Sequence, residues 1–500
     1  MIVEVERELM KISIMHISDL HRDPKNPISN EALLNSLIQD IDNSAAEDPP
    51  IPHPQIIIVS GDIIQGTGKD AEKPDEVLRE QYDQAEQFLG SIADRLLGGN
   101  RQRIVIVPGN HDINFPKMFS ALKEIDYATV DEKKRSELAG LIRESQSKLR
   151  WSWCEFKLYE ITDETLYEQR LAEFISFYDR FYGGTKIYPR DPTQQFDIFD
   201  FPELGLTVVG FNSCFLNDPW NKEGVIHPRA FSHACDELRK RQFRGRLRVA
   251  VWHHSTKGAP RQDDYIDTDF LQQLINHGYS LGFHGHQHKP ELIDEKFAFG
   301  GDRKVNALSA STLAGGERAL APGRARGYNR VVLDTDEWQV ELHVRQMANP
   351  DFLNPIWVKG FSLSQKSFQR FELQRPRPVD PSAIASQDLP EAEKLLREKR
   401  NEEAATILEP LAPLNDIAKR LLLQAFLGSN NKEGIIRCFA EPFSPEEIIA
   451  VCDALWEEEQ RDALRAILSR PVVVEHQDPS VVYIRTKLLG RLGNDRPNKI

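Results

Sequence analysis

Five short polar segments along this chain each follow an apolar run rich in isoleucine, valine or leucine. Such runs of about four to eight residues are typical of strands buried inside a sheet. Loops at the carboxyl ends of neighbouring strands in an α/β sheet meet in one crevice. The sequence therefore predicts that the polar side chains of these segments gather at one sheet edge. The segments are Asp19-Leu20-His21, Gly61-Asp62, Gly109-Asn110-His111-Asp112, His253-His254 and Gly285-His286-Gln287-His288.

Strand-like and helix-like patterns alternate over the first part of the chain, which favours a layered α/β architecture. Apolar residues at helical spacing predict helices over residues 31–41 and 82–96. Strand-like segments return between residues 304 and 373, where they would complete a second sheet. The predicted strands are Ile12–Ile17, Gln55–Ser60, Arg103–Val107, Thr207–Asn212, Leu247–Trp252, Tyr279–Phe283, Lys304–Leu308, Tyr328–Leu333, Trp338–Arg345 and Trp357–Leu373.

The length of 500 residues exceeds what one hydrophobic core normally serves and predicts two domains. We expect the first domain to span residues 1–380, with residues 114–205 as a mostly helical insertion that caps the site. A polar, proline-rich stretch near residues 374–381 is the predicted linker. Residues 381–500 would form an all-α domain of helical hairpins, and Ser444-Pro445-Glu446-Glu447 is a helix start signal. Because this domain lacks a convergent set of histidines and carboxylates, we expect it to bind a protein partner or a second copy.

Charge and cysteine usage limit the classes of function. The net charge of −14 argues against wrapping long duplex DNA, although the Gly- and Arg-rich segment 315–327 is either a phosphate-contacting loop or an ordinary connection. The sequence contains no uninterrupted apolar span, and its mixed, acidic beginning does not resemble a secretion signal. The five cysteines lie far apart without paired spacing, which favours a reducing, cytoplasmic location without membrane contact.

The residue types in the five segments are those that bind divalent metal ions. Asp19 and His21 stand two positions apart, so an extended backbone would point both side chains the same way. Asp62 follows a glycine, which permits close backbone approach to an ion. The remaining donors are an amide oxygen and imidazole nitrogens, from Asn110, His253, His286 and His288. Mixed nitrogen and oxygen donors without thiolate indicate Mn²⁺, with Fe²⁺ or Zn²⁺ as alternatives.

In their order and spacing the segments resemble the calcineurin-like metallophosphoesterase superfamily, whose blocks read D-x-H, G-D, G-N-H-[DE], a later His, and G-H-x-H. The resemblance covers about residues 12–345 and implies a two-sheet αββα sandwich. It implies two divalent transition-metal ions that share Asp62, with His254 as the alternative to His253. One ion would be held by Asp19, His21, Asp62 and His288, and the other by Asp62, Asn110, His253 and His286.

The resemblance also implies a mechanism, in which a hydroxide that bridges the two ions attacks the phosphorus of a phosphoester. His111 would protonate the leaving oxygen or stabilise the transition state, and Asp112 would orient a histidine ring. Two divalent ions would bring four positive charges, and Asp19, Asp62 and the hydroxide would neutralise three of them. The remaining charge of about one suits an anionic substrate.

Three functions remain open at this point. The leading prediction is a phosphodiesterase or nuclease that acts on a nucleotide or nucleic acid. The same ligand set also serves phosphomonoesterases, which act on proteins or nucleotides. A non-catalytic scaffold is the third interpretation, but dead relatives generally lose metal ligands, and every block is intact in this chain.

Overall fold

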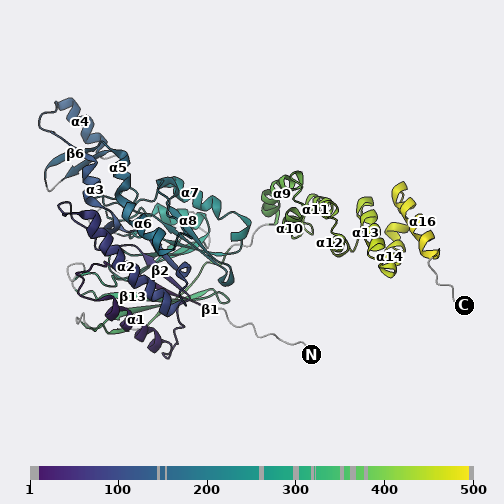
Figure 1. Ribbon diagram of the computed structural model, residues 1–500, viewed down its shortest axis with the longest axis horizontal. Helices are drawn as coiled ribbons and strands as arrows, with labels where there is room; N and C mark the ends of the chain where they lie inside the picture. The colour runs from purple at the N-terminus through teal and green to yellow at the C-terminus, as the bar shows by residue number, and fades with distance from the viewer. Residues whose placement is uncertain are drawn as a thin grey trace. The chain divides into compact units, whose positions relative to one another are not determined.

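A computed structural model of the chain separates into two compact units, Met1–Arg377 and Pro378–Ile500 (Figure 1). Each unit has its own hydrophobic core. The predicted mixed α/β fold with a helical C-terminal region is confirmed. The structure describes residues 11–142, 147–152, 155–257, 264–296, 303–316, 320, 323–349, 354–360, 367–376 and 381–494, with the backbone alone for 381–387 and 493–494.

The first sheet has the strand order β15-β14-β13-β1-β2-β3, and β16 pairs with β14. Strands β1, β2 and β3 are parallel, whereas β13 is antiparallel to β1. The prediction of strand structure throughout 357–373 is confirmed for 357–359 and 369–372 and wrong for 360, 367, 368 and 373, whereas residues 361–366 lie outside the described ranges. The strands are β1 (Lys11–Ile17), β2 (Ile56–Ser60), β3 (Ile104–Val107), β13 (Gly327–Asp334), β14 (Gln339–Met347), β15 (Trp357–Lys359) and β16 (Gln369–Glu372).

The second sheet has the strand order β11-β12-β10-β9-β8-β7. Its four central strands are parallel, and the antiparallel strands β7 and β11 form its two edges. The strands are β7 (Phe196–Phe201), β8 (Leu206–Phe211), β9 (Leu247–Val251), β10 (Tyr279–His284), β11 (Glu291–Lys296) and β12 (Lys304–Ser309).

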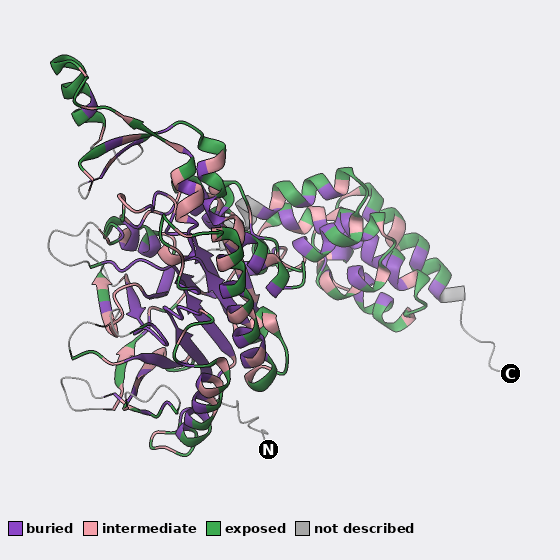
Figure 2. Cartoon of the chain, turned by 60° about the vertical axis from the view of Figure 1, so that its left-hand side comes forward, coloured by how far each residue is buried: buried purple, intermediate pink, exposed green. Residues whose placement is uncertain are grey.

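Helices cover the outer faces of both sheets, so the central strands are buried on two sides (Figure 2). This explains why β2 and β3 are continuous apolar runs rather than alternating ones. The main core includes apolar residues of α1 (Asn30–Ser44), α2 (Pro74–Leu96) and α6 (Ala172–Phe181), together with the facing strands of both sheets. A second cluster joins α7 (Pro228–Glu237) and α8 (Asp269–Asn276) to the other face of the second sheet.

The predicted insertion is less helical than expected. Besides helices, it contains a three-stranded sheet in the order β4-β6-β5, and its last strand, β7, joins the second main sheet. The new strands are only four or five residues long, which is too short for a clear strand periodicity in the sequence. The elements are α3 (Phe115–Ser120), β4 (Leu122–Ile125), α4 (Glu132–Leu141), β5 (Leu149–Ser152), β6 (Lys157–Ile161) and α5 (Glu164–Glu168).

The aromatic side chains of α6 belong to the main core, where Phe177 stacks on Tyr82 with ring centroids 5.0 Å apart. Another contact fastens the insertion to the loop that follows β8. Arg150 pairs with the buried carboxylate of Asp218, which also accepts a 2.8 Å hydrogen bond from the Tyr167 hydroxyl. The base of the insertion is therefore fixed to a loop that adjoins the site described below.

The second unit is a succession of helices in which chain neighbours pack against one another. The predicted start of α13 is confirmed, since Ser444 caps it by accepting a hydrogen bond from the Glu447 amide. Within the described residues, no helix has the length and apolar character needed to cross a membrane. The helices are α9 (Pro381–Arg397), α10 (Asn401–Leu408), α11 (Asp416–Gly428), α12 (Lys432–Cys438), α13 (Pro445–Glu457), α14 (Arg461–Leu468), α15 (Pro471–Val474) and α16 (Pro479–Asn494).

Candidate metal centre

The loops after β1, β2, β3, β9 and β10 meet, as the strand pattern predicts, and backbone hydrogen bonds join them. The Asp19 amide donates to the Gly61 carbonyl at 3.0 Å, and the His21 amide donates to the Asp62 carbonyl at 3.1 Å. On the second sheet, the Gly285 amide donates to the His253 carbonyl at 3.0 Å. All the predicted ligands are thereby brought into two adjoining groups.

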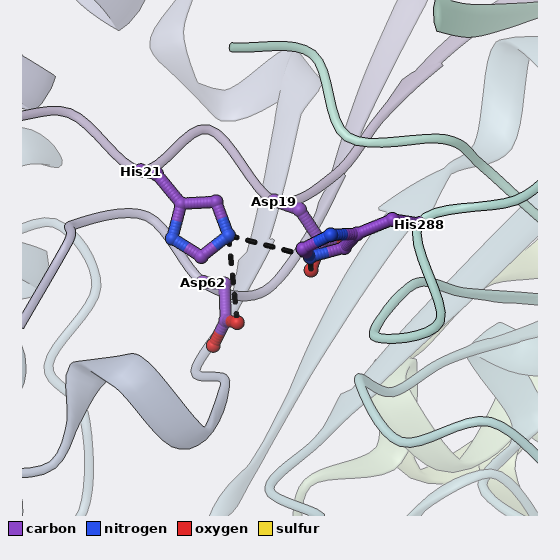
Figure 3. Close-up of side chains that lie close together, drawn as sticks. All are labelled: Asp19, His21, Asp62 and His288. Carbon is purple, nitrogen blue, oxygen red and sulfur yellow. Dashed lines mark hydrogen bonds and ion pairs between the residues drawn. The ribbon is translucent and has the colours of Figure 1, made fainter. Parts of the chain in front are cut away.

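The first group, called the first pocket, consists of Asp19, His21, Asp62 and His288 (Figure 3). One donor atom from each residue lies within 4.8 Å of the others. His288 Nε2 is 3.1 Å from Asp19 Oδ1 and 3.4 Å from His21 Nε2. His21 Nε2 is 4.0 Å from Asp62 Oδ2. Two carboxylates and two imidazoles thus face a common point, which is the arrangement that a divalent ion requires.

The second group, called the second pocket, consists of Asp62, Asn110, His253 and His286. Asn110 Oδ1 lies 3.1 Å from His253 Nε2 and 2.9 Å from His286 Nδ1. His253 Nε2 also lies 3.3 Å from Asp62 Oδ1. The two oxygens of Asp62 therefore face different pockets, Oδ2 the first and Oδ1 the second.

His254, the alternative ligand to His253, contacts polar groups outside the two pockets. Its Nδ1 lies 2.9 Å from Ser213 Oγ, and its Nε2 lies 3.2 Å from Asn217 Nδ2. Both ring nitrogens thus have polar partners outside the two pockets, while His253 directs Nε2 between Asn110 and Asp62. The geometry favours His253 as the donor.

The charges of the pockets fit divalent ions. Burial raises the pKa of Asp62, but the positive charges of His253 and His111 outweigh it and hold the pKa well below its usual range. Burial lowers the pKa of His253, whereas the charge and hydrogen bond of Asp62 raise it to about 9. Burial raises the pKa of Asp19, but the charge and hydrogen bond of His288, whose Nε2 lies 3.1 Å from Asp19 Oδ1, hold the pKa below its usual range. The carboxylates thus stabilise positive charge in the place that an ion would take.

Five of the predicted ligands have left-handed backbone conformations that are uncommon for residues other than glycine. The expectation of an extended backbone at Asp19 and His21 is wrong, because both lie in the left-handed region of a short connection. Such conformations cost about 1–3 kcal/mol each and concentrate at functional sites. The φ angles are 51° for Asp19, 44° for His21, 51° for Asp62, 75° for His286 and 50° for His288.

The glycines of the five segments leave space that the donors occupy. A Cβ on Gly109 would lie 2.3 Å from the backbone nitrogen and Oδ1 of Asp62. On Gly285 it would lie 2.5 Å from Asp19 Oδ2, and on Gly61 it would lie 2.5 Å from His253 Nδ1. Only glycine allows these close approaches, because real Cβ atoms do not come nearer than about 3 Å to such neighbours.

His111 stands at the mouth of the centre with 37% of its side chain exposed. Its Nδ1 lies 2.7 Å from the Gln65 carbonyl oxygen, and its Nε2 lies 3.9 Å from Asp62 Oδ2. Because the carbonyl can only accept, Nδ1 carries the proton of that hydrogen bond. The other ring nitrogen then faces the centre.

Asp112 does not orient a histidine ring, which corrects the expectation from the sequence. Its Oδ2 accepts hydrogen bonds from the amides of Gly109 at 2.7 Å and Ile63 at 3.3 Å. Its Oδ1 accepts a hydrogen bond from the Tyr82 hydroxyl at 3.1 Å. Burial, with the negative charge of Asp62, raises the pKa of Asp112 to about 7. Asp112 therefore joins the loops that carry Asp62 and Asn110.

Sequence reasoning missed a further carboxylate at the second pocket. Asp264 Oδ2 lies 3.8 Å from His286 Nε2 and accepts a 3.2 Å hydrogen bond from Gln287 Nε2. No motif surrounds Asp264, and it precedes the helix α8 in a loop of mixed composition. Nothing in the sequence singles it out from the other aspartates of that loop.

The sequence profile of calcineurin-like phosphoesterases matches residues 12–290. The chain belongs to this family. Calcineurin-like phosphoesterases use a dinuclear metal site, and this member is a metal-dependent phosphoester hydrolase. The first pocket supplies a candidate ligand cluster for that site. No curated protein matches the chain in a sequence comparison.

Solved structures similar to this family member come from several organisms. A dimetal phosphatase from Danio rerio is 10% identical, covers 69% of this chain and 98% of its own, and has a TM-score of 0.35. The calcineurin-like phosphoesterase YfkN from Bacillus subtilis is 10% identical, covers 78% and 98%, and has a TM-score of 0.27. The phosphopantetheinyl hydrolase from Mycobacterium tuberculosis is 13% identical, covers 61% and 91%, and has a TM-score of 0.23.

Proposed function

We propose that this chain is a phosphodiesterase that hydrolyses a nucleotide or nucleic-acid phosphoester at the two pockets. The observation that carries the proposal is the position of Asp62, whose two oxygens face different pockets 4.0 Å from His21 and 3.3 Å from His253. The four residues of each pocket would hold one divalent ion, proposed to be Mn²⁺. Bound ions supply charge that attracts phosphoryl oxygens and acidifies water at neutral pH.

His111 is the proposed proton donor to the leaving oxygen. The Gln65 carbonyl fixes its Nδ1, so the exposed ring presents Nε2 toward the space above Asp62. A histidine in this position can give a proton to a poor leaving group such as a sugar alkoxide. Asp112 supports the reaction indirectly, because it holds the Ile63 and Gly109 amides and thereby the loops of Asp62 and Asn110.

The charge of the centre supports a diester substrate. The sequence count of about one positive charge omits Asp264, whose carboxylate lies beside His286 in the second pocket. Its inclusion brings the formal charge of the loaded centre to about zero. A near-neutral centre attracts a doubly charged monoester less strongly than a strongly positive centre would. A charge of about zero therefore favours the singly charged diester.

The test compares Mn²⁺-dependent turnover of bis-p-nitrophenyl phosphate with that of p-nitrophenyl phosphate. The two compounds share a leaving group, so the comparison sets a singly charged diester against a doubly charged monoester without a difference in leaving-group pKa. We expect a higher kcat/KM for the diester. A preference for the monoester would overturn the proposal in favour of a phosphomonoesterase.

For the second unit we propose contact with a protein partner through a groove of about 430 Å³ beside α11, α12 and α13. Leu427, with 56% of its side chain exposed, and Ile449 are apolar lining residues. Glu457 pairs with Lys432 of the same lining, and Glu446 and Asp453 leave the lining net acidic, which suits a basic segment with apolar side chains. In the full chain, Leu427→Asp should leave turnover unchanged. It should weaken the association of the chain with its partner, which sedimentation velocity measures. Concentration-dependent dimers of the wild type that this variant loses would identify a second copy as the occupant.

We also propose a cytoplasmic location, on the basis of the cysteines. Cys214, Cys235, Cys438 and Cys452 are free thiols in the structure. Thiols persist in reducing compartments, whereas oxidising ones favour disulfides. Fractionation of cells that express the tagged chain tests this location.

A further inference from the structure

The outer nitrogen of His286 faces a carboxylate that comes from a distant part of the chain. Asp264 Oδ2 lies 3.8 Å from His286 Nε2, and each side chain is only 14% exposed. Within the described residues, His286 Nε2 is buried and makes no hydrogen bond. An acidic group thus stands next to a buried nitrogen that requires a partner.

The inner side of the same ring is also fixed. His286 Nδ1 lies 2.9 Å from Asn110 Oδ1, and the His286 amide donates to Asp19 Oδ2 at 3.1 Å. Asp264 in turn accepts a hydrogen bond from Gln287 Nε2 at 3.2 Å. Gln287 is the spacer between His286 and His288, so one short segment supplies two predicted ligands and the group that holds Asp264.

We propose that Asp264 is a positioning residue of the second pocket. Its carboxylate accepts the Nε2 proton of His286, which fixes the tautomer whose Nδ1 lone pair faces the ion. Gln287 orients that carboxylate. We expect the 3.8 Å separation to shorten to a hydrogen bond when an ion is bound, since such contacts are often long in the free protein. The inference rests on the proposed metal centre.

The other histidine of the second pocket is oriented in the same way, but its two ring nitrogens have exchanged roles. His253 presents Nε2 to Asn110, while its Nδ1 lies 2.8 Å from the Ser60 carbonyl oxygen. His286 presents Nδ1, so its partner must reach Nε2 on the far side of the ring. The loop before α8 supplies that partner as a charged side chain. A carboxylate accepts more strongly than a carbonyl and makes the imidazole a better donor.

The experiment measures ion binding rather than turnover. Metal-depleted full-length protein is titrated with Mn²⁺ in a calorimeter, for the wild type, Asp264→Ala, Asp264→Asn and Asp269→Asn. The last variant is the matched control, because Asp269 is an exposed aspartate close to Asp264 in the sequence, at the first residue of α8. We expect Asp264→Ala to weaken one of two binding events by about 10–100-fold. Asp264→Asn should lose less Mn²⁺ affinity, since its amide oxygen still accepts the Nε2 proton. The control should bind Mn²⁺ as the wild type does.

A spectroscopic measurement separates positioning from a general structural effect. In the Zn²⁺-loaded wild type, ¹⁵N-edited NMR should show His286 protonated at Nε2 with a slowly exchanging proton, and Asp264→Ala should lose that signal. Asp264→Asn, which keeps the side-chain shape, carries the test if the alanine variant does not fold. Two wild-type affinities together with an unchanged His286 signal in Asp264→Ala, or two wild-type affinities in Asp264→Asn, would overturn the inference. A wild-type chain that binds no pair of ions would instead overturn the proposed centre itself.

Discussion

The two pockets share Asp62 but are built by different means. In the first pocket, every predicted ligand has a left-handed backbone, namely Asp19, His21, Asp62 and His288. In the second pocket, Asn110 and His253 have ordinary backbone conformations, and only Asp62 and His286 share the left-handed one. Donor positions in the first pocket are therefore set mainly by the main chain.

The histidine rings show the converse difference. His253 and His286 of the second pocket have partners for their outer nitrogens, the Ser60 carbonyl and Asp264. In the first pocket, the outer nitrogen of His21, Nδ1, is buried and has no hydrogen-bond partner within the described ranges. Ring orientation in the second pocket is thus fixed by side-chain and carbonyl contacts. Substitutions that disturb the backbone should affect the first pocket, and those that remove ring partners should affect the second.

Replacement of the shared carboxylate should have the largest effect, because both pockets lose a predicted ligand at once. Asp62→Ala should abolish paired binding of Mn²⁺ and reduce turnover by more than the roughly 10–100-fold typical of an outer partner. Calorimetry and hydrolysis of bis-p-nitrophenyl phosphate measure the two effects. Asp42→Ala, at a site 60% exposed, is the control. Retention of two tight binding events in Asp62→Ala would contradict a shared ligand.

His111 lies beside both pockets and is predicted to belong to neither. His111→Asn should therefore leave Mn²⁺ binding unchanged while it lowers turnover of a diester with an alkoxide leaving group by about 100-fold or more. Diesters with p-nitrophenolate, which departs without protonation, should lose much less. Parallel kinetics on the two substrates make the measurement. Equal losses of turnover on both would assign His111 to stabilising the transition state instead of protonating the leaving oxygen.

The sequence predicted the convergence of the ligands because each one follows a strongly apolar strand. The end of a parallel strand fixes where the next residues lie, so β1, β2 and β9 carried Asp19, Asp62 and His253 to one edge. The local spacing of residues did not predict how the individual side chains reach the pockets. Asp19 and His21 reach the pocket through positive φ angles, which the tertiary contacts of the loop impose.

Asp264 and Asp112 illustrate what the sequence could not supply. The role of Asp264 depends on His286, which is brought near by the pairing of β9 with β10. Asp112 lies within a recognisable segment, yet its partners are the Gly109 and Ile63 amides rather than a ring. In both cases the partner is chosen by loop packing and leaves no local pattern. The short strands of the insertion were missed for a related reason, since β6 has only two buried residues.

A glycine substitution should disturb the backbone-defined pocket selectively. Gly285→Ala would place a Cβ 1.8 Å from Ser18 Oγ and 2.5 Å from Asp19 Oδ2, so the first pocket must shift. We expect the free energy of unfolding to fall by about 1–3 kcal/mol, as for other overpacked sites. Mn²⁺ titration should show one weakened binding event and one unchanged. Gly316→Ala, which meets no atom within 4 Å, is the control. Equal weakening of both events would contradict the separate construction of the pockets.

The smallest expected effect concerns His16, a buried residue of β1, the strand that precedes Asp19. Its Nε2 is 2.9 Å from Ser60 Oγ, and its Nδ1 is 3.3 Å from Asn329 Nδ2. Burial, with the positive charge of His284, lowers the pKa of His16 from 6.5 to about 3, although Asp19 opposes the shift. The unfolded chain therefore binds a proton that the folded chain excludes, and acidification from pH 6.5 towards 3 favours unfolding.

His16 alone should reduce the free energy of unfolding by about 1.0 kcal/mol between pH 6.5 and 5.5, and by up to about 1.4 kcal/mol for each further pH unit towards pH 3. His16→Gln keeps a polar side chain that can bond Ser60 but has no proton to gain, so its unfolding free energy should fall less steeply with acidification. Urea unfolding at pH 6.5 and pH 5.5 measures the slope, with His53→Gln at a site 55% exposed as the control. Identical slopes for His16→Gln and the wild type would show that folding leaves the pKa of His16 unchanged, which would contradict the prediction. The Ser60 carbonyl that holds His253 belongs to the residue His16 contacts, so the same variant should leave the first pocket unchanged and weaken the second slightly.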